Sequence, residues 1–143
     1  MRTDIGLELA RTLERANRVA DATAAYDKLL AQPDAPLIAR TYAGMFFARQ
    51  GDIKKAAALG DAILQLDPDS AAGHYLKGEG LLATGKLDDA RTELTRATTT
   101  DPDVQYFDAL GRAAEVSLAA TNDTKFQELA VQAYTQATQL DPT

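Results

Sequence analysis

The recurrence of similar residues every 34 positions is the feature that most constrains the fold. Ala22, Ala56 and Ala90 are 34 residues apart, and other small or apolar residues recur at the same interval. These further columns are Ala10, Gly44 and Gly78; Leu13, Phe47 and Leu81; Asn17, Gly51 and Gly85; and Leu29, Ile63 and Ala97. A fixed period of this length, with small residues at constant offsets, is typical of an array of helix–turn–helix units. Such arrays bind partners along their surface and rarely carry out chemistry.

Each unit contains two segments in which apolar residues recur three and four positions apart, which predicts two amphipathic helices. We expect eight helices in all, at residues 4–16, 20–32, 37–50, 54–66, 71–84, 88–100, 104–120 and 125–140. Gly51 and Gly85 predict the turns inside the second and third units, because glycine adopts the left-handed conformation that ends a helix. Asn17 is expected to take that role in the first unit, since asparagine tolerates the same conformation.

The junctions between units carry proline and acidic residues. Asp67-Pro68-Asp69-Ser70 and Asp101-Pro102-Asp103 occupy corresponding places in the repeat. Proline cannot continue a helix, and Asp or Ser caps the start of the next one. We therefore divide the single array, 1–143, into units at residues 3–36, 37–70, 71–103 and 104–143.

The last interval departs from the period, because Ala90 and Ala130 are 40 residues apart. The alignment of Phe107, Leu110 and Gly111 with earlier units places the extra residues within 117–124, as a longer first helix or an enlarged turn. Lengthening costs little free energy, so an insertion without a function is favoured over an enlarged binding face.

The small residues predict close approach of paired helices. We expect Gly44 to lie against Ala56, and Gly78 against Ala90, so that the two backbones of each pair come together without an intervening side chain. A leucine at Gly78 or Ala90 would overpack that crossing at a cost of about 1 to 3 kcal/mol.

The chain resembles the tetratricopeptide repeat, and its third unit carries the resemblance most fully. The matching residues are His74, Gly78, Leu81, Gly85, Ala90, Leu94, Ala97 and Pro102. The resemblance implies a right-handed all-α solenoid in which the first helices of successive units line a concave groove. The side chains that it places in that groove are Leu7, Arg11, Arg15, Tyr42, Met45, Arg49, Tyr75, Glu79, Leu82, Asp108, Arg112 and Glu115.

Members of this family that bind chaperones grip a terminal carboxylate with Lys, Asn and Arg side chains of the first helices. The corresponding positions here are Leu7, Arg11, Tyr42, Ala72 and Leu76, so that clamp is absent. Without a cluster of cations, a free carboxylate or a phosphopeptide has little to hold it. We expect recognition by apolar contact and shape instead, centred on Tyr42, Met45, Tyr75 and Leu82.

The charge of the chain bears on its partners. The formal net charge is −6 and the isoelectric point is near 4.7, which disfavours nucleic acid and anionic membrane surfaces because both require a basic patch. No apolar run approaches the roughly 18 residues of a membrane span, so direct membrane insertion is not expected. The expected partner is another protein, as a peptide or a helix, with a homo-oligomer as a further possibility. The compartment, cytoplasmic or periplasmic, stays open.

The inventory of reactive side chains argues against an enzyme and against a cofactor or metal. The chain has one histidine, no cysteine and two serines. These residues are too few to predict a hydrolytic triad or a zinc site. His74 is expected to pack at a helix crossing. The run Gly78-Glu79-Gly80-Leu81-Leu82-Ala83 mimics a dinucleotide fingerprint, but that motif must follow a strand and open a helix, whereas this run is predicted to lie inside a helix. Gly80 has no explanation in the repeat pattern, and the Asp-Pro-Asp runs are interpreted as caps in preference to cation ligands.

The chain ends soon after the last repeat, at Asp141-Pro142-Thr143, with no closing helix. Arrays of this kind usually cover the last apolar face with such a helix. Its absence would expose Leu129, Ala133, Tyr134, Ala137 and Leu140. The missing helix favours truncation of a longer chain over self-association. The repeat pattern, the groove residues and the lack of reactive side chains together predict a non-enzymatic scaffold that binds a partner in its groove. The alternatives are a scaffold that self-assembles through this end and a segment of a longer bacterial secretion, pilus or polysaccharide-export protein.

Overall fold

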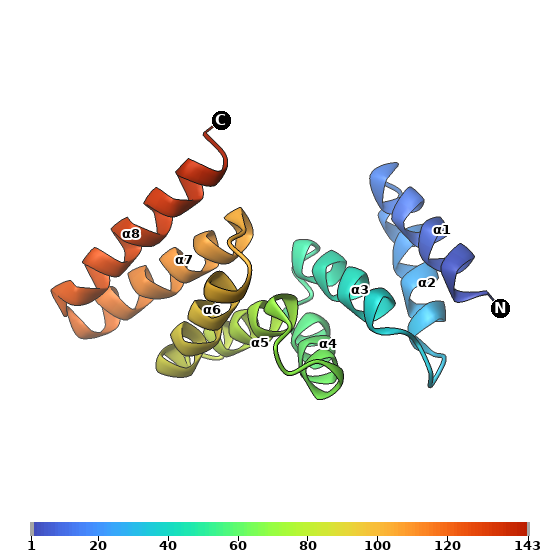
Figure 1. Cartoon of the computed structure of the whole chain (residues 1–143), viewed down its shortest axis with the longest axis horizontal. Helices are drawn as coiled ribbons and strands as arrows, with labels where there is room; N and C mark the ends of the chain where they lie inside the picture. Colours follow the sequence, from blue (N-terminus) through green and yellow to red (C-terminus); the bar gives the residue numbers. More distant parts are fainter. Residues whose placement is uncertain (1, 143) are drawn as a thin grey trace.

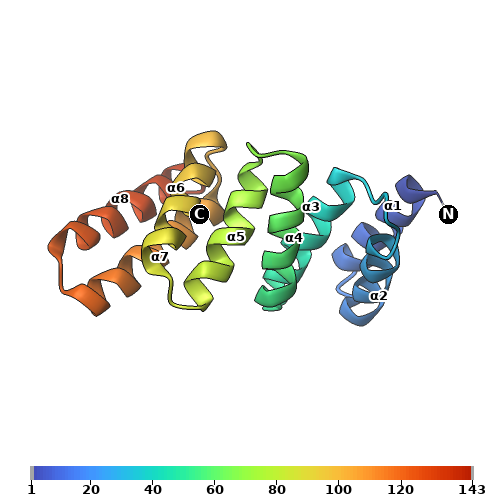
Figure 2. The same ribbon diagram turned by 90° about the horizontal axis from the view of Figure 1, so that it is seen from below.

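Eight α-helices in antiparallel pairs make up the fold. The computed structural model describes residues 2–142. The helices are α1 (Thr3–Arg15), α2 (Val19–Leu30), α3 (Leu37–Arg49), α4 (Ile53–Leu66), α5 (Ala71–Ala83), α6 (Leu87–Thr100), α7 (Val104–Thr121) and α8 (Thr124–Leu140). They follow one another in a curved row from α1 at one end to α8 at the other (Figure 1, Figure 2). The predicted all-α solenoid is confirmed, and the helix ends differ from the expected ones by two residues at most.

The turns inside the helix pairs have the predicted left-handed backbone. Gly51 and Gly85 adopt φ values of 81° and 77°, and Asn17 adopts 57°. Asn122, in the turn of the last pair, does the same with a φ of 56°. This last residue was not predicted, although asparagine in a short polar stretch is a recognisable signal for the conformation.

Polar side chains cap the helices at the junctions between pairs, as expected. The Ser70 hydroxyl accepts a hydrogen bond from the Gly73 N–H of α5 at 3.0 Å. The Asp103 carboxylate accepts one from the Gln105 N–H of α7 at 2.8 Å. Each cap satisfies a donor that has no partner within its own helix.

The row is curved because the first helices of successive pairs approach one another, whereas within residues 2–142 the second helices do not. The first helices are α1, α3, α5 and α7, and the second helices are α2, α4, α6 and α8. A row joined along one side and spread along the other must bend toward the joined side. The first helices therefore form the inner, concave side.

Gly44 and Gly78, the glycines predicted at the helix crossings, lie closest to different elements. In α5, a methyl group added to Gly78 would lie 2.6 Å from Leu94 Cγ and 3.5 Å from the Ala90 carbonyl oxygen, so the expected crossing with α6 is confirmed. Gly44 also faces α4, since its added methyl group would lie 3.6 Å from Leu59 Cβ. A methyl group on Gly44 would lie 2.5 Å from Leu76 Cδ1 of the next pair, because the first helices pack against each other as well as against their partners.

Three glycines bring α4 and α5 into close backbone contact. A methyl group on Gly60 would lie 2.9 Å from the Lys77 backbone nitrogen, and one on Gly80 would lie 2.5 Å from Ala57 Cβ. Gly73 is equally confined, since its added methyl group would meet Leu64 at 2.8 Å. Gly80, which the repeat pattern leaves without a role, is therefore needed for packing against the preceding pair.

The joint between the first two pairs is built from large side chains instead. The Tyr26 ring of α2 lies 5.0 Å from the Phe46 ring of α3 between centroids, and Phe46 lies 5.3 Å from Phe47. Lys55 of α4 places its ammonium 4.2 Å above the Phe47 ring and forms an ion pair with Asp27 of α2. Aromatic packing here replaces the close backbone contact seen between α4 and α5.

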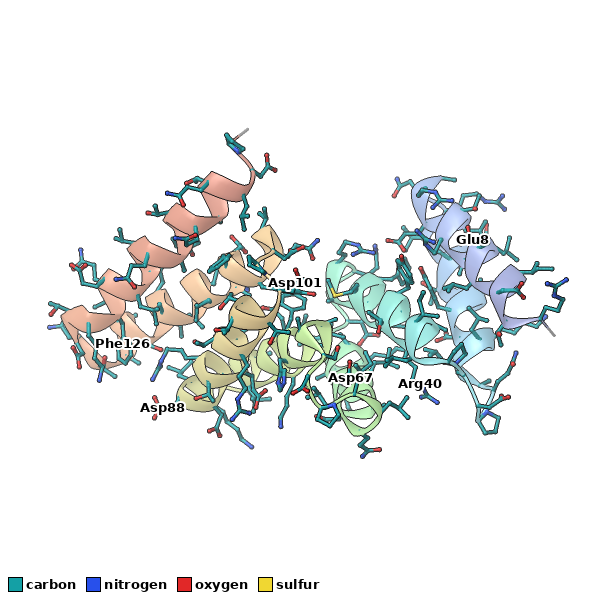
Figure 3. All side chains as sticks on the ribbon, viewed as in Figure 1. Glu8, Arg40, Asp67, Asp88, Asp101 and Phe126 are labelled. Carbon is teal, nitrogen blue, oxygen red and sulfur yellow. The ribbon has the colours of Figure 1, made fainter. Side chains whose placement is uncertain are left out.

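The extra residues of the last unit lengthen its helices. α7 has 18 residues and α8 has 17, against 13 and 14 in the pair α5 and α6. The turn between them is short, so the longer-helix alternative holds and the enlarged turn does not. Phe126, labelled in Figure 3, lies near the tip of this hairpin. Its ring supports the Arg91 guanidinium of α6 at 4.2 Å.

The expected open surface on α8 is only partly present. Ala133 is buried, and the Tyr134 ring covers Gly111 of α7, where an added methyl group would come within 2.6 Å of it. The expectation was wrong for Ala133, which faces α7 inside the hairpin, whereas Leu129, Tyr134 and Ala137 are partly exposed. Leu140 is exposed, as expected, and so is Val131.

Candidate binding groove

Side chains of α1 and α3 form a linked cluster at the first end of the inner face. The Arg11 guanidinium lies 4.2 Å from the centre of the Tyr42 ring and donates a hydrogen bond to Glu8 at 2.9 Å. Glu8 is labelled on α1 in Figure 3. Arg49 forms an ion pair with Glu14, whose carboxylate also accepts a hydrogen bond from the Tyr26 hydroxyl at 2.9 Å. Burial and this bond to Glu14 raise the pKa of Tyr26 above its usual value.

A small hollow of about 170 Å³ lies within this cluster. Its lining consists of Arg11, Glu14, Arg15, Tyr42 and Arg49. The expectation that the groove holds no cluster of cations is therefore wrong. Three arginines converge because α1 and α3 face each other across the joint, which spacing along one helix does not reveal. Glu14 was missed as well, although its place three residues after Arg11 puts it on the same helix face.

The other end of the inner face is acidic. Arg112 of α7 donates hydrogen bonds to Asp108 at 2.9 Å and to Glu79 of α5 at 3.0 Å. Burial acts to lower the pKa of Arg112, but the bonds to Asp108 and Glu79 outweigh it and raise that pKa. Glu115, one turn further along α7, accepts a hydrogen bond from Tyr134 at 2.7 Å.

The middle of the inner face is partly closed by aromatic packing. Tyr75 of α5 and Tyr106 of α7 lie 4.9 Å apart between ring centroids, and only 7% of Tyr75 is exposed. Burial, with a smaller effect from the Glu79 carboxylate, raises the pKa of Tyr75 to about 12. Leu7 is buried to the same extent, whereas Tyr42, Met45 and Leu82 are partly exposed. The surface open to a partner therefore runs mainly over these last three residues.

A larger hollow of about 590 Å³ lies outside the predicted groove, along α4 and α5. Its apolar lining includes Ile53, Ala57 and Leu81, and Lys54 and Lys77 also line it. No residue of the predicted groove lines it. It is therefore an alternative binding surface, and a binding experiment has to compare variants of this hollow with variants of the groove.

The groups considered for chemistry have structural partners. Nδ1 of His74 lies 2.6 Å from a Glu93 carboxylate oxygen, and its Nε2 lies 3.0 Å from the Pro68 carbonyl oxygen. The Gly78–Ala83 run lies inside α5, as predicted. Within the described part of the chain, no group of three acidic, histidine or cysteine side chains is placed to hold a metal ion. No helix in that part combines the length and apolar character needed to cross a membrane.

Comparisons with known proteins agree with this architecture. Two models of the tetratricopeptide repeat match the chain, one over residues 7–71 and the other over residues 47–114. No curated protein matches it in sequence.

Solved structures match over nearly the whole chain. MamA, residues 41 to the end, from Desulfovibrio magneticus RS-1 is 18% identical with a TM-score of 0.75, and the match covers 99% of this chain and 76% of that one. TTC0263, a thermophilic TPR protein of Thermus thermophilus, is 16% identical with a TM-score of 0.63, and the match covers 98% and 85% of the two chains. At these identities the structural likeness extends to the fold alone.

Proposed function

Since this chain belongs to the tetratricopeptide-repeat family, we propose that its inner face holds an extended peptide or a helix of another protein. Repeat arrays of this family are protein-interaction scaffolds, generally without enzymatic activity. The finer proposal concerns the place of binding, which is the groove along α1, α3, α5 and α7. A partner seated there would contact several repeats at once.

The observation that carries the proposal is the combination of fixed charges and partly exposed apolar side chains on this face. Tyr42, Met45 and Leu82 pack against the core with one side and leave the other open. Arg11 and Arg112 are held between helices by ring and carboxylate contacts. Aromatic residues, methionine and arginine are enriched at protein interfaces, and a groove between helices accepts a helix or an extended segment.

A capture experiment followed by quantitative binding tests the proposal. The immobilised chain is used to isolate a partner, which is identified and purified, and its affinity is measured for matched double variants. Tyr42→Ala with Leu82→Ala removes apolar surface from the groove. Lys54→Ala with Leu81→Ala alters the hollow beside α4 to a similar extent.

We expect the groove variant to weaken binding by about tenfold or more, as interface anchors do, and the control variant to change it little. Circular dichroism checks that both remain folded. If the Lys54→Ala and Leu81→Ala variant weakened binding more than the groove variant, the partner would bind at the hollow along α4 and α5, and the groove proposal would be refuted. Tyr75 is avoided because it is buried, so its truncation would also destabilise the fold.

Self-association is a second candidate, favoured by exposed apolar side chains on the two end helices. Ile5 and Leu9 of α1 are 58% and 55% exposed, and Val131 of α8 is 57% exposed. Sedimentation velocity at several concentrations tests this. Mass that grows with concentration, and that Ile5→Ser with Leu9→Ser abolishes, would support assembly through these ends. A constant monomer mass would rule it out.

A further inference from the structure

The hollow between α1 and α3 has the dimensions and the lining of a site for one small charged group. Its volume of about 170 Å³ equals roughly six water molecules at about 30 Å³ each. Arg11 and Arg15 enter it from α1, and Tyr42 and Arg49 enter it from α3. It therefore lies across the joint between two repeats, where an extended partner on the inner face would pass.

The arginines are positioned in advance but keep most of their donors. Each guanidinium carries five N–H groups. Arg11 donates to Glu8, Arg15 donates to the Thr12 hydroxyl at 3.2 Å, and Arg49 pairs with Glu14. The Tyr42 ring beneath Arg11 further restricts that side chain. Fixed guanidinium groups with free donors suit a planar carboxylate, which they can bind through two parallel hydrogen bonds.

Positive charge exceeds negative charge in the lining. Three arginines face one carboxylate, that of Glu14, and this carboxylate is already engaged by Arg49 and the Tyr26 hydroxyl. Glu8, the remaining acidic partner, is more exposed and does not line the hollow. An added anion would therefore find unsatisfied positive charge there, although the chain as a whole is acidic.

The opposite end of the groove has the reverse charge. Glu79, Asp108 and Glu115 lie there, and Arg112 forms ion pairs with both Glu79 and Asp108. An acidic segment is repelled at this end and attracted at the other. The groove therefore distinguishes the two ends of a partner by charge.

We propose that the hollow lined by Arg11, Arg15 and Arg49 is a carboxylate subsite, which takes an Asp or Glu side chain from an acidic segment of the partner protein. The subsite rests on the groove function proposed above and names the chemical group that the groove recognises in its partner. The partner lies with its acidic part across α1 and α3, away from the acidic side chains of α5 and α7.

Fluorescence anisotropy with labelled synthetic peptides tests the subsite without knowledge of the natural partner. The probes are capped peptides of alternating Glu and Leu, the same peptide with Gln for Glu, and one with Lys for Glu. The protein variants are Arg15→Ala with Arg49→Gln and, as a control that removes the same charge elsewhere, Arg18→Ala with Arg96→Gln. Arg18 and Arg96 are exposed and do not line the hollow.

We expect the Glu peptide to bind more tightly than the Gln and Lys peptides. The variant Arg15→Ala with Arg49→Gln, called the hollow variant, should bind the Glu peptide about tenfold more weakly, as expected for the loss of charge-assisted contacts. The control variant should change that affinity by less than about twofold. If the two variants weakened binding equally, the attraction would be unspecific electrostatics. If the Glu and Gln peptides bound equally, the carboxylate would not be recognised. Either outcome overturns the subsite. Displacement of the Glu peptide by inorganic phosphate but not by acetate at equal concentration would overturn the carboxylate in favour of phosphate.

The failure of the subsite can be told apart from the failure of the groove. If the identified partner loses affinity with the Tyr42→Ala and Leu82→Ala variant but not with the hollow variant, the groove function stands and the subsite is refuted. If neither variant affects the partner, the groove function itself fails. Thermal unfolding of every variant separates lost binding from lost structure.

Discussion

At the residue scale, single glycines decide how closely neighbouring helices approach. Gly60 lies where an added methyl group would meet backbone atoms of α5, the Lys77 nitrogen at 2.9 Å and the Gly73 carbonyl oxygen at 3.1 Å. Backbone atoms cannot rotate away as a side chain can. Gly44 is confined mainly by the tip of the Leu76 side chain, so the two positions should differ in their tolerance of alanine.

Gly60→Ala should lower the free energy of unfolding by about 1 to 3 kcal/mol, because α4 and α5 have to separate. The loss occurs although alanine favours a helix by about 1 kcal/mol. Gly44→Ala should cost less, since Leu76 can change its rotamer. Urea unfolding followed by circular dichroism measures both, and an equal or larger loss for Gly44→Ala would contradict the backbone argument.

The hydroxyl of Tyr134 makes stability depend on alkaline pH. Burial and the hydrogen bond to Glu115 raise its pKa from 10.0 to about 12. Below pH 10 the phenol is neutral in both the folded and the unfolded chain. Above it the unfolded chain loses the proton first, so stability falls as pH rises toward 12.

Tyr134→Phe should therefore lose less unfolding free energy than the wild type between about pH 9 and about pH 11. Other buried tyrosines still contribute, so the dependence should become smaller without disappearing. Guanidinium unfolding at the two pH values provides the measurement. Equal dependence in the two proteins would mean that folding does not raise the pKa of Tyr134 in solution, through burial or through the Glu115 bond.

At the element scale, one side chain of α6, that of Arg91, contacts the far part of the long hairpin α7–α8. Arg91 stacks on Phe126, hydrogen-bonds to the buried Ser117 and forms an ion pair with Asp88. Phe126 and Asp88 are labelled near this tip in Figure 3. These contacts fasten the part of the hairpin that extends beyond the usual repeat length.

Arg91→Ala should lower unfolding free energy by about 1 to 2 kcal/mol, the usual range for a partly buried cation–π contact with a hydrogen bond. Arg91→Lys, which keeps the charge but loses the planar group, should recover only part of it. Hydrogen exchange should accelerate at the tip, around residues 118–128, more than in α3 and α4. Uniform acceleration over the chain would show that Arg91 has no local role.

The helices were predictable from local signals, and the side-chain clusters were not. Asn17, Gly51 and Gly85 mark turns through their own backbone preference, so the sequence identifies helix ends within two residues. The subsite depends on where Arg49 lies relative to Arg11, two residues on helices of different repeats. The period of the sequence determines which face of each helix points inward, but the rotation of one pair against the next determines which inward side chains meet.

At the scale of the whole molecule, the joint of α2 with α3 and the joint of α4 with α5 differ in construction. The joint of α2 with α3 relies on Tyr26, Phe46 and Phe47 and involves less backbone contact than that of α4 with α5. In a repeat array, each pair is stabilised by its neighbours through such joints. If one joint is lost, the parts on its two sides should therefore unfold independently instead of cooperatively.

Phe46→Ala should remove about 3 to 5 kcal/mol of stability, as truncation of a buried phenylalanine does, and should uncouple the first pair. We expect hydrogen exchange in α1 and α2 to exceed that in α4 and α5 by far more than in the wild type. Met45→Ala, its neighbour on the partly exposed side, serves as the control and should leave that difference nearly unchanged. A single cooperative loss of protection over all eight helices in Phe46→Ala would refute the uncoupling.

The glycine-lined contact of α4 with α5 also has a mechanical consequence. Two backbones in direct contact resist sliding and rotation, whereas rings such as those of Tyr26 and Phe46 can tilt against each other with little change in contact area. The molecule should therefore be stiff at its centre and compliant at α2–α3. When its ends are pulled apart, we expect extension to begin at this aromatic hinge, while the central four helices move as one block.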